Sequence, residues 1–193
     1  MVDNLELIKS YLHQYKEGEC FYHMQILRRG KDHPDLPAAN RVIKAYFISG
    51  PEYLEKHEKE IKDLCEFFGA RAYINLAPKD CTKLAKLAMY DLAKRIFEGD
   101  VKKIYKVFNT AAGELKSAFP HWVVDIDEIG QLEEIKAIIE KISQNSIYCE
   151  IPTKSGCHLI TKPFNLMEFK NKFPNVDVHK NNPTILYIPK CLD

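Results

Sequence analysis

Two carboxylates stand one residue apart at the end of an apolar run, at Asp125 and Asp127. The residues from Trp122 to Val124 are aromatic or β-branched, which favours a buried strand. Because side chains alternate faces along a strand, both aspartates would point to one side while Ile126 points into the core. Two like charges this close repel each other unless a proton or a cation lies between them. The spacing therefore favours a divalent cation such as Mg²⁺, which takes one or two carboxylates together with substrate phosphates.

The same pair also fits a simpler interpretation, in which the strand ends in a polar loop. Asp127 would then cap a helix that begins near Ile129. Two polar features further along the chain favour the metal site over this alternative.

The first feature is a serine–glycine turn between two predicted strands, followed by a histidine. The Ser155 hydroxyl and the Gly156 backbone can donate to a phosphate, because glycine lets the backbone approach closely. Lys154 adds a positive charge, and His158 adds a donor whose protonation is tunable. Lys162 is either a second phosphate contact or a solvent-facing lysine. Taken alone, the turn is also compatible with an ordinary Ser-Gly turn and a structural histidine.

The second feature is a single carboxylate between two β-branched residues, Val176-Asp177-Val178. On a strand, Asp177 would face opposite to both valines. A buried and unpaired carboxylate is costly. Asp177 is therefore predicted either to lie on an exposed edge or to complete the site that Asp125 and Asp127 begin.

In order and placement, the three motifs resemble the archaeo-eukaryotic primase superfamily, which includes primase-polymerases. They are Val124-Asp125-Ile126-Asp127, Ser155-Gly156-Cys157-His158 and Val176-Asp177-Val178, and the resemblance covers residues from about 119 to 188. Two residues separate Ser155 from His158, where the family usually has one. The chain also lacks the zinc-binding cysteine cluster that many primases carry.

The resemblance implies a metal-dependent nucleotidyltransferase, similar to a DNA primase or primase-polymerase, that adds nucleotides on a single-stranded template. It implies that Asp125, Asp127 and Asp177 hold one or two Mg²⁺ or Mn²⁺ ions. His158 joins these three aspartates in the catalytic set. The residues implied to bind the nucleotide are Lys154, Ser155, Gly156, His158 and Lys162.

The implied partners are nucleoside triphosphates and a single-stranded nucleic acid template, and the sequence leaves open whether a replicative helicase works beside the chain. Template binding would need local basic and aromatic groups, with stacking worth ~1–3 kcal/mol per base. The basic cluster Arg28, Arg29 and Lys31 is the predicted nucleic-acid contact.

Composition limits these interpretations. The chain has 193 residues, enough for one compact domain or two closely packed halves, and its formal net charge of +1 provides no global field for nucleic acid. None of the six cysteines forms a CxxC pair, which argues against a zinc ribbon or a thioredoxin motif. No signal peptide and no bilayer-spanning apolar run is evident, so we expect a cytoplasmic protein without a membrane partner.

The predicted elements indicate an α+β fold with mixed sheets. An N-terminal α/β module, residues 1–110, would pack on an RRM-like βαββαβ half, residues 111–193. The last two strands, 176–178 and 184–188, are predicted to form a closing hairpin around Asn181-Asn182-Pro183.

Two other functions remain open at this point. The same carboxylates suit a metal-dependent nuclease or phosphohydrolase, in which water is the nucleophile. An RRM-like sheet also suits a non-catalytic nucleic-acid-binding module, although the chain lacks an RNP1-like aromatic pattern.

Overall fold

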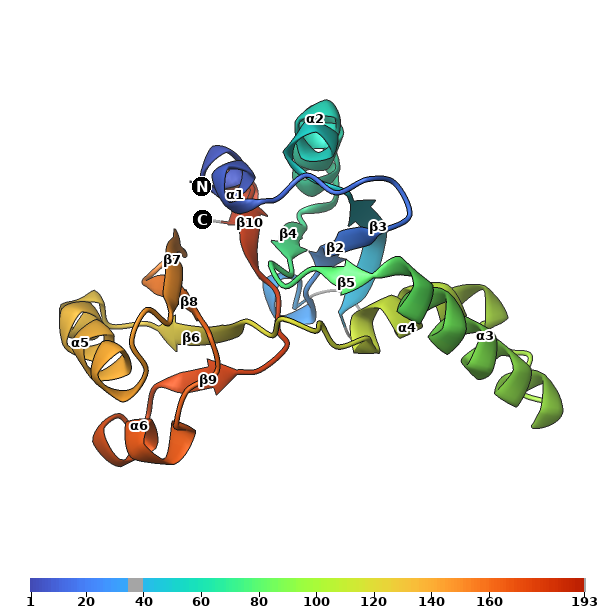
Figure 1. The fold of residues 1–193 in the computed structure, drawn as a ribbon. Helices are drawn as coiled ribbons and strands as arrows, with labels where there is room; N and C mark the ends of the chain where they lie inside the picture. Colours follow the sequence, from blue (N-terminus) through green and yellow to red (C-terminus); the bar gives the residue numbers. More distant parts are fainter. Residues whose placement is uncertain (35–39, 193) are drawn as a thin grey trace.

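The structure, a computed structural model, describes residues 1–34 and 40–192 and confirms the α+β class (Figure 1). The helices are α1 (Leu5–Tyr11), α2 (Pro51–Phe68), α3 (Cys81–Phe97), α4 (Val107–Glu114), α5 (Leu132–Ile142) and α6 (Leu166–Lys172). The strands are β1 (Val2–Asp3), β2 (Cys20–Arg28), β3 (Arg41–Ile48), β4 (Arg71–Ile74), β5 (Lys79–Asp80), β6 (Trp122–Ile126), β7 (Ile147–Pro152), β8 (Cys157–Thr161), β9 (Asp177–His179) and β10 (Thr184–Ile188). Short 3₁₀ turns are η1 (Gly30–Asp32), η2 (Ile104–Lys106), η3 (Ile129–Gln131) and η4 (Lys190–Leu192).

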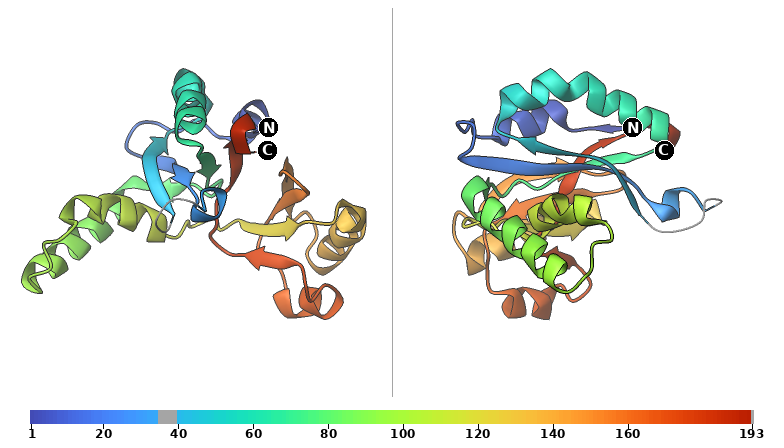
Figure 2. Two further views of the ribbon diagram at one scale, coloured as in Figure 1. Left: turned by 180° about the vertical axis from the view of Figure 1, so that it is seen from behind. Right: turned by 90° about the vertical axis from the view of Figure 1, so that its right-hand side faces the viewer.

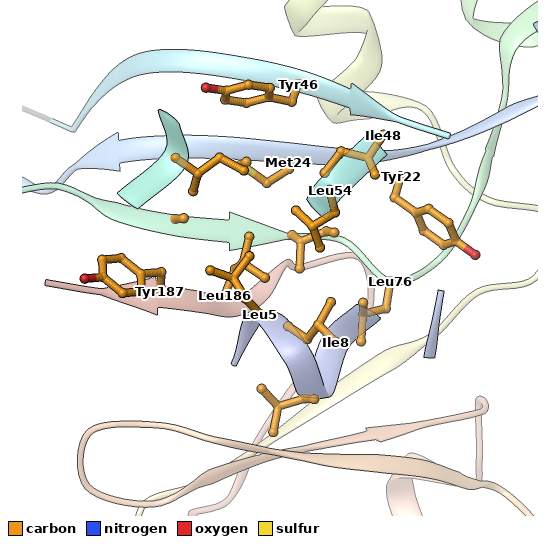
Figure 3. Packing of buried hydrophobic residues seen from close by; sticks show 14 of the residues in the cluster. Leu5, Ile8, Tyr22, Met24, Tyr46, Ile48, Leu54, Leu76, Leu186 and Tyr187 are labelled. Atoms are coloured by element: carbon orange, nitrogen blue, oxygen red, sulfur yellow. The ribbon is translucent and has the colours of Figure 1, made fainter. Parts of the chain in front are cut away.

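The larger sheet has the strand order β1-β10-β4-β2-β3, with β5 paired to one end of β2. Helices α1 and α2 cover one face, where Met24, Ile26 and Leu54 are fully buried in the largest core cluster. Figure 3 shows this packing, in which side chains from both helices meet those of the strands. Figure 2 shows α3 and α4 on the opposite side of the sheet from α2. There Phe21 packs with residues of both helices.

The smaller sheet has the order β7-β8-β6-β9 and is built from a β6-α5-β7-β8-α6-β9 unit, as the βαββαβ prediction requires. One face packs on α5 and α6 through Val124, Ile126 and Leu159. Val123 and Ile160 point the other way and join the core cluster of the larger sheet. The two sheets therefore meet across the face that carries odd-numbered β6 residues, and Asp125 belongs to that face.

Two predictions about the strands are wrong. All strand pairs in the described residues are antiparallel, so neither sheet is mixed. The closing hairpin does not form, because β9 pairs with β6 whereas β10 lies between β1 and β4 in the larger sheet. Every residue of β10 is buried, which a central strand achieves and a terminal edge hairpin does not. The larger sheet thus draws strands from both sides of residue 110.

His23 is a buried histidine in the middle of β2, with 6 % of its surface exposed and no hydrogen-bond partner for Nε2 in the described ranges. Burial, with a smaller contribution from the nearby Lys79 charge, lowers the pKa of His23 to about 4. The folded protein therefore keeps His23 neutral at pH values where the unfolded chain binds a proton. Stability should consequently fall as the pH drops from about 6.5 to about 4.

We expect this single group to remove about 3 kcal/mol over that range. Urea denaturation at several pH values measures the slope, and a His23→Leu variant should show a flatter profile. His13→Leu, at an exposed position, is the control and should keep the wild-type slope. An unchanged slope in His23→Leu would contradict the assignment.

Candidate active site

The predicted motif residues meet in a row across three neighbouring strands. Asp125 of β6 lies directly opposite His158 of β8 on one side and Asp177 of β9 on the other. Cross-strand partners share a face of the sheet. The structure thus brings together one residue from each of the three motifs on the face that the larger sheet approaches.

His158 is held at both ring nitrogens. Its Nε2 lies 3.5 Å from Oδ1 of Asp125, and its Nδ1 lies 2.8 Å from the Thr184 hydroxyl. Thr184 begins β10, so this histidine links the smaller sheet to the larger one. The contact with His158 lowers the pKa of the Asp125 carboxyl and outweighs burial, which raises it; His179 and Lys31 add smaller lowering effects. Asp125 is therefore ionised at neutral pH.

Asp127 comes directly after β6, and together with Asp125 it lines two separate cavities. The first has a volume of about 450 Å³ and lies toward α5 and α6. Its acidic lining residues are Asp125, Asp127, Glu128, Glu134 and Asp177. This side of the aspartate pair has the charge that attracts cations.

The second cavity has a volume of about 410 Å³ and lies between the two sheets. Arg29, Arg71 and Tyr73 contribute from the larger sheet and its adjoining loop. From the smaller sheet and its turn come Asp125, Asp127, Lys154, Ser155, His158 and His179. This side of the aspartate pair therefore carries the positive groups that a phosphate chain needs.

An ion pair fixes the basic wall of the second cavity. Arg71 donates from Nε and Nη2 to the two carboxylate oxygens of Asp32, at 2.8 and 2.6 Å, and both side chains are largely buried. Arg29 donates from Nη1 to the Tyr73 hydroxyl at 3.2 Å. Because Asp32 belongs to η1, the pair also holds Lys31 near the aspartates.

The three basic residues predicted to contact nucleic acid, Arg28, Arg29 and Lys31, do not all lie at this cavity. Arg29 lines the cavity, and Lys31 is close enough to lower the pKa of Asp125. Arg28 lies opposite Arg41 at the end of the β2–β3 ladder and is not among the residues that line this cavity.

The turn between β7 and β8 is packed against the end of β6. A Cβ at Gly156 would overlap the carbonyl oxygen of Ile126 and lie 3.0 Å from Cα of Asp127, so only glycine fits. This close approach places Lys154 and Ser155 beside Asp127 in one cavity. The Gly156 N–H, predicted to bind phosphate, instead donates to the Thr153 hydroxyl at 3.0 Å, because the turn uses it internally.

Two predicted lysines differ in position. Lys154 lines the second cavity, and its Nζ donates to the backbone carbonyl of Leu192 at 3.0 Å. Lys162 follows the opposite end of β8 from His158, with its Nζ 5.7 Å from the centroid of the Tyr148 ring. Lys162 lines neither cavity, so the structure does not bring it to the site.

Sequence reasoning missed the wall that the larger sheet supplies. Arg71 and Tyr73 stand two residues apart on β4, so they share one face of the larger sheet. Nothing local indicated that this face would oppose Asp125. Thr184 was likewise missed, because its contact with His158 depends on the placement of β10.

The carboxylate oxygens at this site are the kind of ligand that a hard cation such as Mg²⁺ prefers. Within residues 1–34 and 40–192, no three His, Cys, Asp or Glu side chains are grouped closely enough to hold a metal ion on their own. A pair such as Asp125 and Asp127 matches the one or two protein carboxylates with which Mg²⁺ is usually bound beside substrate phosphates.

Across the described residues, the structure contains no helix with the length and apolar character needed to cross a bilayer. Comparisons of the chain with protein-family models, with curated proteins and with solved structures found no match.

Proposed function

We propose that the chain is a metal-dependent nucleotidyltransferase of the primase-polymerase type, which adds nucleotides to a strand paired with a single-stranded template. One observation supports this most directly. An ionised Asp125 stands between His158 and Asp177, with an acidic cavity on one side and a basic cavity on the other. In nucleotidyl transfer a 3′ oxygen bonds to the α-phosphate while pyrophosphate leaves, so a cation and the triphosphate must meet at one point. Asp125 and Asp127, which line both cavities, would provide such a point.

The proposed roles follow from the positions. Asp125 and Asp127 would hold Mg²⁺ or Mn²⁺ together with the substrate phosphates, and Asp177 would add a negative charge opposite Asp125. The bound cation would neutralise charge that develops on the transferred phosphate. Arg29, Lys154 and Ser155 would bind and orient the triphosphate from the second cavity. Little covalent chemistry is asked of these residues, because positioning and charge neutralisation provide most of the rate.

His158 would act chiefly by positioning. Its hydrogen bond to Thr184 fixes the ring, and the ring in turn holds the Asp125 carboxylate in its ionised form. The nucleoside triphosphate and template are the proposed partners, and a replicative helicase is compatible with the proposal.

The test is metal-dependent incorporation. Single-stranded template, with and without primer, is incubated with mixed dNTPs or NTPs and Mn²⁺ or Mg²⁺. The wild-type protein should produce extended products, and an Asp125→Asn/Asp127→Asn variant should produce none. If the template is shortened instead, the protein is a nuclease and the proposal is wrong. If no product forms and calorimetry detects no binding of nucleotide or Mn²⁺, the non-catalytic nucleic-acid-binding module becomes the favoured function.

A further inference from the structure

A groove between the edge strand β3 and α4 adjoins the candidate active site. Its volume is about 660 Å³, and Gln25 and Asn40 line both this groove and the cavity that contains Asp125. The other polar or charged lining residues are Arg41, Lys44, Tyr105, Lys106, Asn109, Thr110 and Glu114. The groove and the catalytic cavity are therefore direct neighbours, with Gln25 and Asn40 at their common border.

A basic segment of the chain ends at the groove, where its last two residues, Tyr105 and Lys106, are among the lining residues. Residues 81–106, which form α3 and η2 with their connection, contain seven Lys or Arg and three Asp or Glu, in a chain whose formal net charge is only +1. Lys94 and Arg95 pair with acids on the same segment. By contrast, Lys102, Lys103 and Lys106 form no ion pair within the described chain, so their charge is available to an anionic ligand.

An exposed aromatic ring accompanies that charge. Tyr105 is 76 % exposed, although it lies beside the groove rather than at a chain end, and the Lys106 Nζ lies 5.8 Å from the centroid of its ring. Phe108 on the following turn contacts Phe47 of β3 at a centroid distance of 5.2 Å, which anchors α4 on the sheet. Tyr105 therefore lies in a turn, η2, that directly precedes a helix packed on the sheet.

We infer that this groove carries the single-stranded nucleic acid toward the Asp125 site. The groove offers a ring on which bases can stack, the charges of Lys106 and Arg41 for the phosphates, and the amide and hydroxyl of Asn109 and Thr110. This is the chemistry by which proteins bind single strands without sequence preference. An acidic peptide would use the charge but not the ring. The claim that the groove leads the strand toward Asp125 rests on the proposed function, whereas the claim that the groove binds a single strand does not.

The experiment measures binding of a fluorescent oligothymidylate of about 16 nucleotides by anisotropy, without metal or nucleotide, at several salt concentrations. Tyr105→Ala should weaken binding about tenfold through loss of one stacked base. Lys106→Ala should weaken binding and reduce the slope of log K against log salt by about 0.7. Tyr90→Ala and Lys86→Ala make the same changes at exposed α3 positions outside the groove and should leave affinity unchanged.

Three results would overturn the inference: no oligonucleotide binding by the wild-type protein, equal losses in the groove and control variants, or competition by polyglutamate with no effect of Tyr105→Ala. The last would indicate an acidic peptide as the ligand. Failure of the proposed function is distinguishable, because oligonucleotide binding is measured without metal or nucleotide, whereas nucleotide incorporation is measured in a separate assay. If the groove variants weaken binding but the wild-type protein incorporates no nucleotide, the groove is a single-strand binding site and the proposed nucleotidyltransferase activity is wrong.

Discussion

Gly156→Ala is expected to lower the free energy of unfolding by about 3 kcal/mol. The added Cβ would overlap the Ile126 carbonyl oxygen, and it would lie 2.9 Å from the carbonyl carbon and 3.0 Å from Cα of Asp127. All of these are backbone atoms, so no side-chain rotation can relieve the overlap. Either the β7–β8 turn or the end of β6 must move, and both carry residues of the candidate site.

Gly113→Ala is the matched control for this prediction. Gly113 lies in α4, where an added Cβ meets nothing within 4 Å. The substitution should be neutral or stabilise by about 0.5–1 kcal/mol, because alanine favours the helix. Urea denaturation measures both variants. A loss below about 1 kcal/mol in Gly156→Ala would show that the turn moves freely and does not fix Asp127.

Asp125→Asn is expected to reduce the rate of metal-dependent nucleotide incorporation at least about a hundredfold, the scale seen when one transition-state-stabilising group is lost. The substitution keeps the shape of the side chain and removes its charge at the centre of the row with His158 and Asp177. The side chain is about a third exposed, so its 3.5 Å contact with His158 should contribute no more than about 1 kcal/mol to stability. Activity and stability therefore separate in this variant.

The control is Asp63→Asn, which removes an exposed carboxylate on α2 that forms no ion pair in the described structure. Incorporation is followed by gel and unfolding by urea for both variants. Normal incorporation by Asp125→Asn would contradict the assigned role, and a large loss of stability would mean that Asp125 is a structural residue. Asp63→Asn should resemble the wild-type protein in both measurements.

Local patterns in the sequence predicted much of the smaller sheet. The alternation around Asp125 and Ile126 predicted opposite faces for the two side chains, with Ile126 in the core, as observed. The βαββαβ order was equally readable, because helical and strand periodicities depend on residues a few positions apart. The prediction that Asp125 and Asp127 lie close together also came from local spacing, and both residues line the same two cavities.

The closing hairpin shows where local signals mislead. Asn181-Asn182-Pro183 is a strong turn signal, but a turn does not determine which strand the chain pairs with next. The apolar run in residues 185–188 indicates a strand buried on both faces, and the interior of the larger sheet provides such a place between β1 and β4. The free energy gained by burying β10 in the larger sheet therefore outweighed the short connection that favoured a hairpin with β9.

The sequence by itself determined the fold class, the elements that carry each motif and the chemistry of the individual side chains, because these depend on residue type and short-range periodicity. Only the tertiary structure decided that Asp125 lies opposite His158 and Asp177, that Arg71 and Tyr73 form the facing wall, and that Lys162 lies at the far end of its strand. Those relations depend on strand register and on the way two sheets face each other. Both are set by burial of apolar surface between segments far apart in the chain, which no local pattern records.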